Sequence, residues 1–231
     1  MTNKEGYSEK KRNLPEYRGT LTPAQAAQGI NAANRNAASL AEDARILFES
    51  GKLASAISLA ALSIEESGKA SILRGIILED DPVALKKEWK RFRDHRSKNG
   101  SWILPDLARK GATKLKHLSI VTKRDASHTE QLHSLKMVGL YTDCYADIHW
   151  SEPTEIFSED YTSFVEDIVK RSELLSKRSF VSEKEMEIWV KCLKPVWRSE
   201  QMKFGLIQFS ILMHQEGLSD TDPEDFAAFL G

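Results

Sequence analysis

Cysteine is scarce in this chain of 231 residues, which contains only Cys144 and Cys192. The two are far apart and form no CxxC motif. This scarcity excludes a disulfide framework and a cysteine-based structural zinc site, and it is typical of proteins in a reducing compartment. We therefore expect a cytoplasmic protein.

Long hydrophobic runs are also missing. The longest apolar stretch, Phe204 to Met213, is too short and too interrupted to cross a bilayer. The charged N-terminal residues are not followed by an apolar segment, so we expect no signal peptide. The sequence thus predicts neither a membrane span nor a membrane partner.

The motifs of the common nucleotide-binding and nucleophilic enzymes do not occur. The chain has no Walker loop, no GxGxxG and no GxSxG motif. His128 and His133 do not have the spacing of helical metal ligands, and no carboxylate cluster accompanies them. We expect no metal ion and no cofactor.

No segment alternates apolar and polar residues over the length of a strand, whereas helix signals are strong, so the sequence predicts an all-α protein. Thr22-Pro23-Ala24-Gln25 is a typical helix start with a capping box, and Gly51 is a typical helix end. Small and apolar residues between them recur every three or four positions, which favours close helix packing: Ala26, Ile30, Ala33, Ala37, Leu40, Ala44 and Leu47. The next helix is expected to fold back antiparallel on this one.

Shorter helices are expected in the rest of the chain. Proline or capping residues mark their starts, and one helix is expected to end at Gly139. The expected segments run from Pro82 to about Asn99-Gly100, from Pro105 through Val121, from Ser127 to Val138, from Ser158 through Leu175, and from Asp222-Pro223 onward, with an irregular connection from Ile148 to Pro153.

Charged residues interrupt the segment Lys52 to Asp80, which is otherwise apolar or small on nearly every side. A helix of that kind is normally buried, and buried charges require partners. Glu65 and Lys69 have the spacing of an ion pair, and Glu66 lies beside them. We expect Glu65 to orient a cation or histidine of the following segment, while an internal salt bridge that fixes helix register is a compatible alternative.

A cationic block follows. Residues 86–124 contain thirteen Lys and Arg against three Asp and Glu, a net charge of +10 in a chain whose overall charge is −1. Such an asymmetry indicates an anionic partner, although a solvated helix face would have the same composition.

The first part of this block, Lys86 to Lys98, contains one histidine, His95. Arg91 is four residues before it, so on a continuous helix the two would share a face, and Lys98 would lie one turn further. Neighbouring cations disfavour a protonated imidazole, and Arg and Lys bind phosphate. Metal-independent cleavage of RNA needs such a base and such cations. The alternative is a histidine that only caps a helix end. Arg124 and His128 repeat the spacing, with a helix start expected between them.

Four ordered blocks resemble the AbiV family of abortive-infection proteins, which is placed among the HEPN domains. The blocks lie between about Leu40 and Pro153 and read Ala44-x-x-Leu47-Phe48-x-x-Gly51, then Ala56-Ile57-x-Leu59-Ala60-x-x-x-Ile64-Glu65-Glu66-x-Gly68-Lys69, then Trp89-x-x-Phe92-x-x-His95-x-x-Lys98, then Leu135-Lys136-x-x-Gly139-Leu140-Tyr141-x-Asp143.

The resemblance implies a helical bundle built on a long antiparallel helix pair, a homodimer, and an anti-phage toxin that acts on RNA or translation. Catalytic HEPN domains carry an Arg, four to six intervening residues and a His, and two such motifs meet in one cleft. Here Arg91 and His95 have three residues between them, and the residue with the family's spacing is Lys90.

These considerations lead to two hypotheses. The first is a metal-independent endoribonuclease, and the second is a non-catalytic module that blocks translation by binding RNA or a protein. The sequence does not distinguish transfer, messenger and ribosomal RNA as the target. A phage activator or an antitoxin protein is a further partner to consider. For the nuclease we assign catalytic roles to His95, Arg91 and Lys98, supporting roles to Glu65, Glu66, Lys69 and Arg96, and RNA-binding roles to Arg93, Lys90, Lys136 and Tyr141.

The expected organisation has three parts: a flexible lead-in over residues 1–20, a helical core over 21–153, and a C-terminal helical extension over 154–231 that packs on the core.

Overall fold

The protein folds around two long helices. The structure is a computed structural model that describes residues 14–122 and 127–231. Helix α2 (Pro23–Glu49) begins at Thr22, whose side chain accepts from the backbone of Gln25, and the predicted capping box is confirmed. The chain then turns at Gly51, which has a φ of +71° as a C-terminal glycine should. Helix α3 (Leu53–Ile76) follows.

Helices α2 and α3 form the predicted pair, and alanines make their close contact possible. The small residues of α2 expected to form a seam are buried against α3 within one chain. On the α3 side, Ala56, Ala60 and Ala61 are completely buried. Ser63 also donates to the carbonyl of Ala37 at 2.7 Å, which ties the two backbones together. The seam is therefore an intrachain feature.

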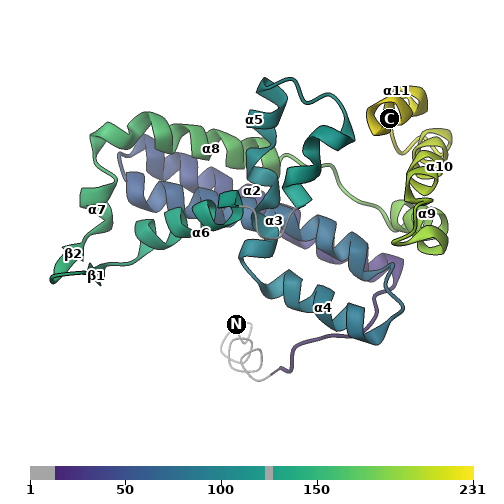
Figure 1. Cartoon of the computed structure of the whole chain (residues 1–231), viewed down its shortest axis with the longest axis horizontal. Helices are drawn as coiled ribbons and strands as arrows, with labels where there is room; N and C mark the ends of the chain where they lie inside the picture. Colours follow the sequence, from purple (N-terminus) through teal and green to yellow (C-terminus); the bar gives the residue numbers. More distant parts are fainter. Residues whose placement is uncertain (1–13, 123–126) are drawn as a thin grey trace, which may run out of the picture.

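The remaining elements surround this pair (Figure 1). They are mostly helical, which confirms the all-α prediction. In chain order they are α4 (Pro82–Arg93), η1 (Arg96–Ile103), α5 (Leu104–Arg109), η2 (Leu115–Thr122), α6 (Ser127–Leu140), β1 (Asp143–Tyr145), β2 (His149–Ser151), α7 (Pro153–Ile156), η3 (Glu159–Tyr161), α8 (Thr162–Ser176), α9 (Glu183–Leu193), η4 (Lys194–Val196), α10 (Met202–Gln215) and α11 (Pro223–Leu230).

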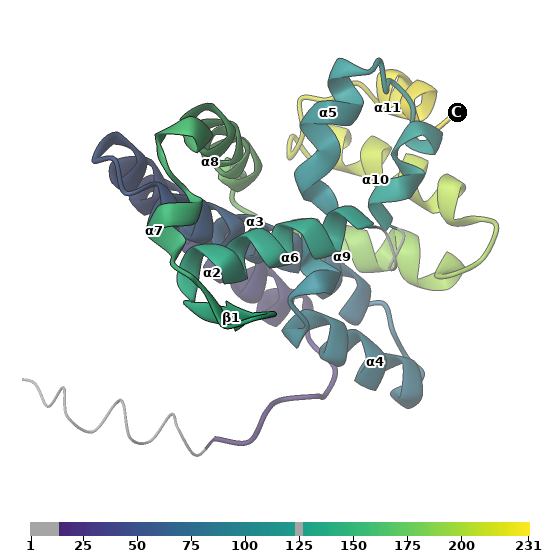
Figure 2. The same cartoon turned by 60° about the vertical axis from the view of Figure 1, so that its left-hand side comes forward.

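Two apolar clusters hold these elements together. In the first, α6 and α8 pack on α3 through residues such as Leu132, Val165 and Ile168, all of which are completely buried. In the second, the N-terminal end of α2 and the C-terminal end of α3 pack against α4 and α9 through Ile76, Trp89 and other residues. Figure 2 shows α6 crossing over α3. It also shows α9, α10 and α11 grouped together on the side of the molecule where the chain ends. None of the helices in the described ranges has the length and apolarity that crossing a bilayer would require.

Four local predictions differ from the structure. The helix expected from Pro105 through Val121 is divided into α5, which ends at Arg109, and the 3₁₀ segment η2. Helix α4 ends at Arg93 instead of near Asn99, because Asp94 adopts an extended conformation. The connection expected to be irregular, Ile148 to Pro153, contains the second strand of a short antiparallel hairpin that pairs Cys144 with Trp150. Gly139 does not end its helix, since α6 continues to Leu140. Of the expected lead-in, residues 1–13 lie outside the described residues, as does Arg124.

Gly139 instead allows α6 to contact α3. A Cβ atom at this position would overlap the Ser58 hydroxyl and would lie 2.8 Å from the carbonyl oxygen of Ala54. We expect Gly139→Ala to lower the free energy of unfolding by about 1–3 kcal/mol, because overpacking outweighs the gain in helix propensity. Urea unfolding would measure the change. Gly29→Ala, where the new methyl group meets only the flexible end of Leu73, is the matched control and should be neutral or stabilising; equal effects of the two would contradict this explanation.

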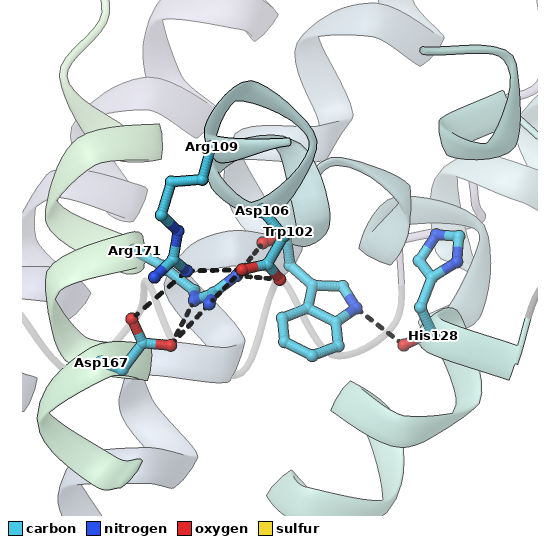
Figure 3. Close-up of polar contacts among 6 residues, drawn as sticks. All are labelled: Trp102, Asp106, Arg109, His128, Asp167 and Arg171. Atoms are coloured by element: carbon cyan, nitrogen blue, oxygen red, sulfur yellow. Dashed lines mark hydrogen bonds and ion pairs between the residues drawn. The ribbon is translucent and has the colours of Figure 1, made fainter. Parts of the chain in front are cut away.

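An ion-pair cluster joins η1 and α5 to α8 (Figure 3). The guanidinium of Arg171, almost completely buried, donates to Asp106 at 2.8 and 2.9 Å and to Asp167 at 2.7 Å. It also lies over the ring of Trp102. The indole of Trp102 in turn donates to the carbonyl of His128 on α6 at 2.7 Å. The cluster thus fixes η1 between α6 and α8.

The same cluster should make stability depend on pH. The hydrogen bond from Arg171 holds the pKa of Asp106 below its usual value. A carboxylate with a lowered pKa stabilises the fold above its unfolded pKa of about 3.9, and this contribution is lost as the pH falls through the folded value. We expect Arg171→Met to cost about 1–3 kcal/mol at pH 6 and clearly less at pH 3.

Urea unfolding of both proteins at the two pH values would check this expectation. Arg109→Met, which removes a largely exposed partner of the same carboxylate, is the control and should have a small effect at both pH values. A cost for Arg171→Met that did not change with pH would be inconsistent with the ion-pair explanation.

Candidate functional site

The site forms where α4 breaks. Asp94 accepts hydrogen bonds from the backbone and the hydroxyl of Ser97, at 2.9 and 2.7 Å. These bonds start η1 and set His95 at its first turn. A carboxylate that binds the backbone two or three residues ahead favours such a turn over a continued helix. His95 therefore lies on a tight connection between α4 and η1.

The buried carboxylate of Glu65 forms the floor of the site. Glu65 lies on α3 and is only 1% exposed. One of its oxygens, Oε2, lies 2.7 Å from Nδ1 of His95, and the other, Oε1, accepts from Nζ of Lys136 at 2.7 Å. Lys136 lies on α6 and is 3% exposed, so its charge is neutralised inside the protein. The prediction that Glu65 contacts a cationic or histidine side chain of the basic segment is confirmed for His95.

His95 is accessible, unlike its two partners, with 54% of its side chain exposed. When Nδ1 donates to Glu65, the neutral ring keeps its lone pair on Nε2. Lys136 Nζ also lies 3.2 Å from Nδ1, which brings a fixed positive charge to the same edge of the ring. An exposed imidazole oriented by a buried carboxylate is an arrangement that can transfer protons.

A second histidine lies beside the first. The rings of His133 and His95 stack with their centroids 6.1 Å apart and their planes at 30°. Burial, together with the charge of Lys136, lowers the pKa of His133, so this ring is neutral at neutral pH. His133 and Lys136 are three residues apart on α6 and thus share a face. From the sequence, Lys136 was assigned to RNA binding and His133 was not recognised as part of the site, although the three-residue spacing between them was an available signal.

Lys98 lines a small cationic pocket, as does Arg96, the neighbour of His95 in the chain. The pocket has a volume of about 240 Å³, and its lining includes Arg91, Arg96 and Lys98 together with the hydroxyl residues Ser71, Ser97 and Ser101. No carboxylate is among the described residues that line it. Lys98 is 6% exposed, and burial lowers its pKa although Glu65 acts in the opposite direction. Cations and hydroxyls without acids are the groups that bind a phosphate.

Two glycines allow η1 to lie against its neighbours at this pocket. A Cβ atom at Gly68 of α3 would overlap the carbonyl oxygen of Lys98. A Cβ atom at Gly100 would likewise overlap the carbonyl oxygen of Val121. Asn99, which is completely buried, donates to the carbonyl of Thr129 on α6 at 3.1 Å. The backbone around Lys98 is therefore held from three sides.

Arg91 and His95 do not share a helix face, since α4 ends between them. Arg91 donates to Glu88 at 2.6 Å, and its Nε is buried without a hydrogen-bond partner among the described residues. Glu65 and Lys69 do not form the expected ion pair. Lys69 instead pairs with Glu66 at 2.5 Å and lies over the ring of Phe92. Glu65 is left free to bind Lys136 and His95.

The other basic residues are distributed around the site. Arg96 pairs with Glu130 at 2.8 Å on the surface. Arg93 donates to the carbonyls of Trp89 and Tyr17 and packs over the Trp89 ring. Lys90 and Tyr141 are exposed. Among the cations assigned to RNA binding, Lys136 alone is enclosed, so we place it in the floor of the site.

The described residues contain no group of three His, Cys, Asp or Glu side chains close enough together to bind a metal ion.

Comparison with known families gives one match. A family model described as AbiV, of the HEPN type, matches residues 25–173. The matched segment contains α3, α4, α6 and most of α2 and α8, and it includes every residue of the site described above. It extends beyond both ends of the segment in which the four sequence blocks lie. No curated protein and no solved structure matches the chain.

Proposed function

This chain belongs to the AbiV family of HEPN-domain abortive-infection proteins, and we propose that it is a metal-independent endoribonuclease that acts as an anti-phage toxin. The observation that carries the proposal is the contact between buried Glu65 and exposed His95, with Lys136 on the same carboxylate. A carboxylate at this position is expensive to bury, and it fixes the orientation and tautomer of the histidine.

In the proposed reaction His95 acts as a general base. Its Nε2 takes the proton of a ribose 2′-hydroxyl, and the oxygen attacks the adjacent phosphorus. The bond from phosphorus to the 5′ oxygen breaks, which leaves a 2′,3′-cyclic phosphate on one fragment. The 5′ oxygen takes a proton from a second imidazole and leaves as a hydroxyl. Glu65 keeps the His95 ring in place and stabilises its protonated form.

Arg91 and Lys98 bind the phosphate in this proposal. Both line the cationic pocket, Arg91 from the segment before His95 and Lys98 from the segment after it. Negative charge builds up on the phosphate oxygens in the transition state, and positively charged groups in a partly dry site stabilise that charge. Arg96 adds a third cation at the rim, while Lys90, Arg93 and Tyr141 offer surface for more distant parts of the RNA.

A homodimer is part of the proposal. Its support is the family resemblance, in which two copies contribute to one cleft, because the alanine seam is already used within the chain. The second copy would supply the imidazole that protonates the leaving oxygen. RNA is the proposed substrate without further distinction of its kind, and the proposed site of action is the cytoplasm.

The test is direct. Purified protein is incubated with labelled RNA in EDTA, and the fragment ends are identified. Fragments with 2′,3′-cyclic phosphate ends, absent with the His95→Ala protein as a control for contaminating nuclease, are the expected result. Intact RNA under all conditions, together with normal growth of bacteria that express the protein, would refute the nuclease.

A second candidate function is translation block by binding alone. One observation favours it: Arg91 is engaged by Glu88 and is separated from the His95 helix face. Under this alternative the protein would retard labelled RNA in a gel without cutting it, and His95→Ala would still arrest growth.

A further inference from the structure

A second cavity shares Ser101 with the cationic pocket. It has a volume of about 330 Å³, which is within the range of small-ligand sites. Its walls come from α2, α3, η1, Glu185 of α9 and the segment that joins α8 to α9, which Figure 1 shows as an extended connection. Asn31 fixes this segment through two hydrogen bonds with the backbone of Val181, at 2.7 and 2.9 Å. The wall of the cavity that this segment forms is therefore held in place by hydrogen bonds to α2.

The walls of this cavity contain polar groups that lack partners. Asn34, Ser67 and Ser101 all line it. In the described part of the chain, the side-chain oxygen of each is buried and has no hydrogen-bond partner. Buried polar atoms are nearly always satisfied, by protein or by a bound molecule. Three such atoms around one cavity indicate a ligand with several hydrogen-bonding groups.

The rim of the cavity offers a flat apolar ring and a guanidinium. Phe180 lines the cavity and is 76% exposed. Arg178 also lines it and donates through Nε to the carbonyl of Leu175, and the described residues place no carboxylate within ion-pair distance of it. Arg74, by contrast, is neutralised by Glu185 at 2.5 Å. An exposed aromatic ring beside an unpaired arginine is typical of surfaces on which a nucleic-acid base stacks.

The cavity adjoins the cationic pocket directly. Gly68, Ser71 and Ser101 line both spaces. The cationic pocket is suited to a phosphate, and the second cavity to the larger, mostly uncharged group attached to it. In RNA each phosphate is joined to a nucleoside, so the two adjoining spaces match one nucleotide unit.

We propose that the cavity lined by Asn34, Ser67 and Phe180 binds a nucleoside of single-stranded RNA, with its base stacked on Phe180 and its phosphate in the cationic pocket. The inference rests on the proposed function, since it names a subsite for the same substrate. Unpaired RNA is required because a base within a duplex cannot stack on a protein ring.

The experiment measures RNA binding in the His95→Ala protein, which should bind RNA without cutting it. Fluorescence anisotropy with a labelled single-stranded RNA in EDTA gives the Kd. Phe180→Ala should raise the Kd about ten-fold, because loss of one stacked base costs about 1–3 kcal/mol. Phe180→Trp should bind as well as the parent. Phe204→Ala, which removes a similarly exposed phenylalanine from α10, is the matched control and should leave the Kd unchanged.

A second RNA, in which abasic sites replace the bases, separates stacking from a general loss of affinity. The parent should bind it more weakly, and Phe180→Ala should have no further effect. The nucleoside site is wrong if Phe180→Ala binds the normal RNA within two-fold of the parent, or if it weakens binding of both RNAs equally. If wild type cleaves RNA in these cases, the proposed function survives. If neither the parent binds RNA nor wild type cleaves it, both proposals fail.

Discussion

Replacing His95 by alanine should lower the rate of RNA cleavage about 10²–10⁴-fold, the usual contribution of a general base. The loss should be this large because Nδ1 is held by Glu65, and more than half of the side chain is open to solvent, where the proposed substrate would bind. Cleavage of a labelled RNA under single-turnover conditions measures the rate of the chemical step. Expression in a bacterial host should show the same difference as a loss of growth arrest.

The control for this experiment is His149→Ala, which removes an exposed histidine from β2. It should cleave RNA at the wild-type rate. His95→Ala should also keep a near wild-type free energy of unfolding, since more than half of its side chain is in solvent. Equal cleavage by wild type and His95→Ala would remove His95 from the reaction.

Loss of Glu65 should have the largest effect on stability. Its carboxylate is the ion-pair partner of Lys136, and both are almost completely buried. Glu65→Ala leaves a buried ammonium without a counter-charge, which typically costs about 3–5 kcal/mol. The variant should also lose the orientation of His95 and with it most of the cleavage activity.

A double substitution separates these two effects. Glu65→Met combined with Lys136→Met replaces the ion pair by apolar side chains of similar size, and such replacements are often neutral or stabilising. We expect the double variant to recover most of the stability lost in Glu65→Ala, as measured by urea unfolding, but to remain unable to cleave RNA. A double variant that is as unstable as Glu65→Ala would argue against the ion-pair explanation. Recovery of cleavage would show that Glu65 has no positioning role.

Local signals in the sequence predicted the framework well. The capping box at Thr22, the turn at Gly51 and the proline starts at Pro82 and Pro223 are all found where they were expected. Each of these signals depends on neighbouring residues only, so one sequence is enough to detect it. The burial of Glu65 was also predictable, because its helix is apolar on nearly every side.

Contacts between distant segments were harder to predict. Glu65 and Lys136 are 71 residues apart in the chain, and no local pattern indicates that their side chains meet. The end of α4 depends on Asp94 binding Ser97, which competes with an otherwise good helix pattern. Gly139 resembles a helix end in sequence, but its small size serves the contact with α3. In each case tertiary packing decides between locally acceptable conformations.

Gly68 has no functional group, yet it determines where the segment after His95 can lie. Any larger residue at position 68 would push the Lys98 carbonyl away from α3. Because His95 lies three residues before Lys98, its imidazole would then move away from the Glu65 carboxylate. In a saturation mutagenesis experiment scored by the proposed growth arrest, position 68 should therefore tolerate as few amino acids as His95 itself. A search for important residues that considers only acids, bases and nucleophiles would overlook it.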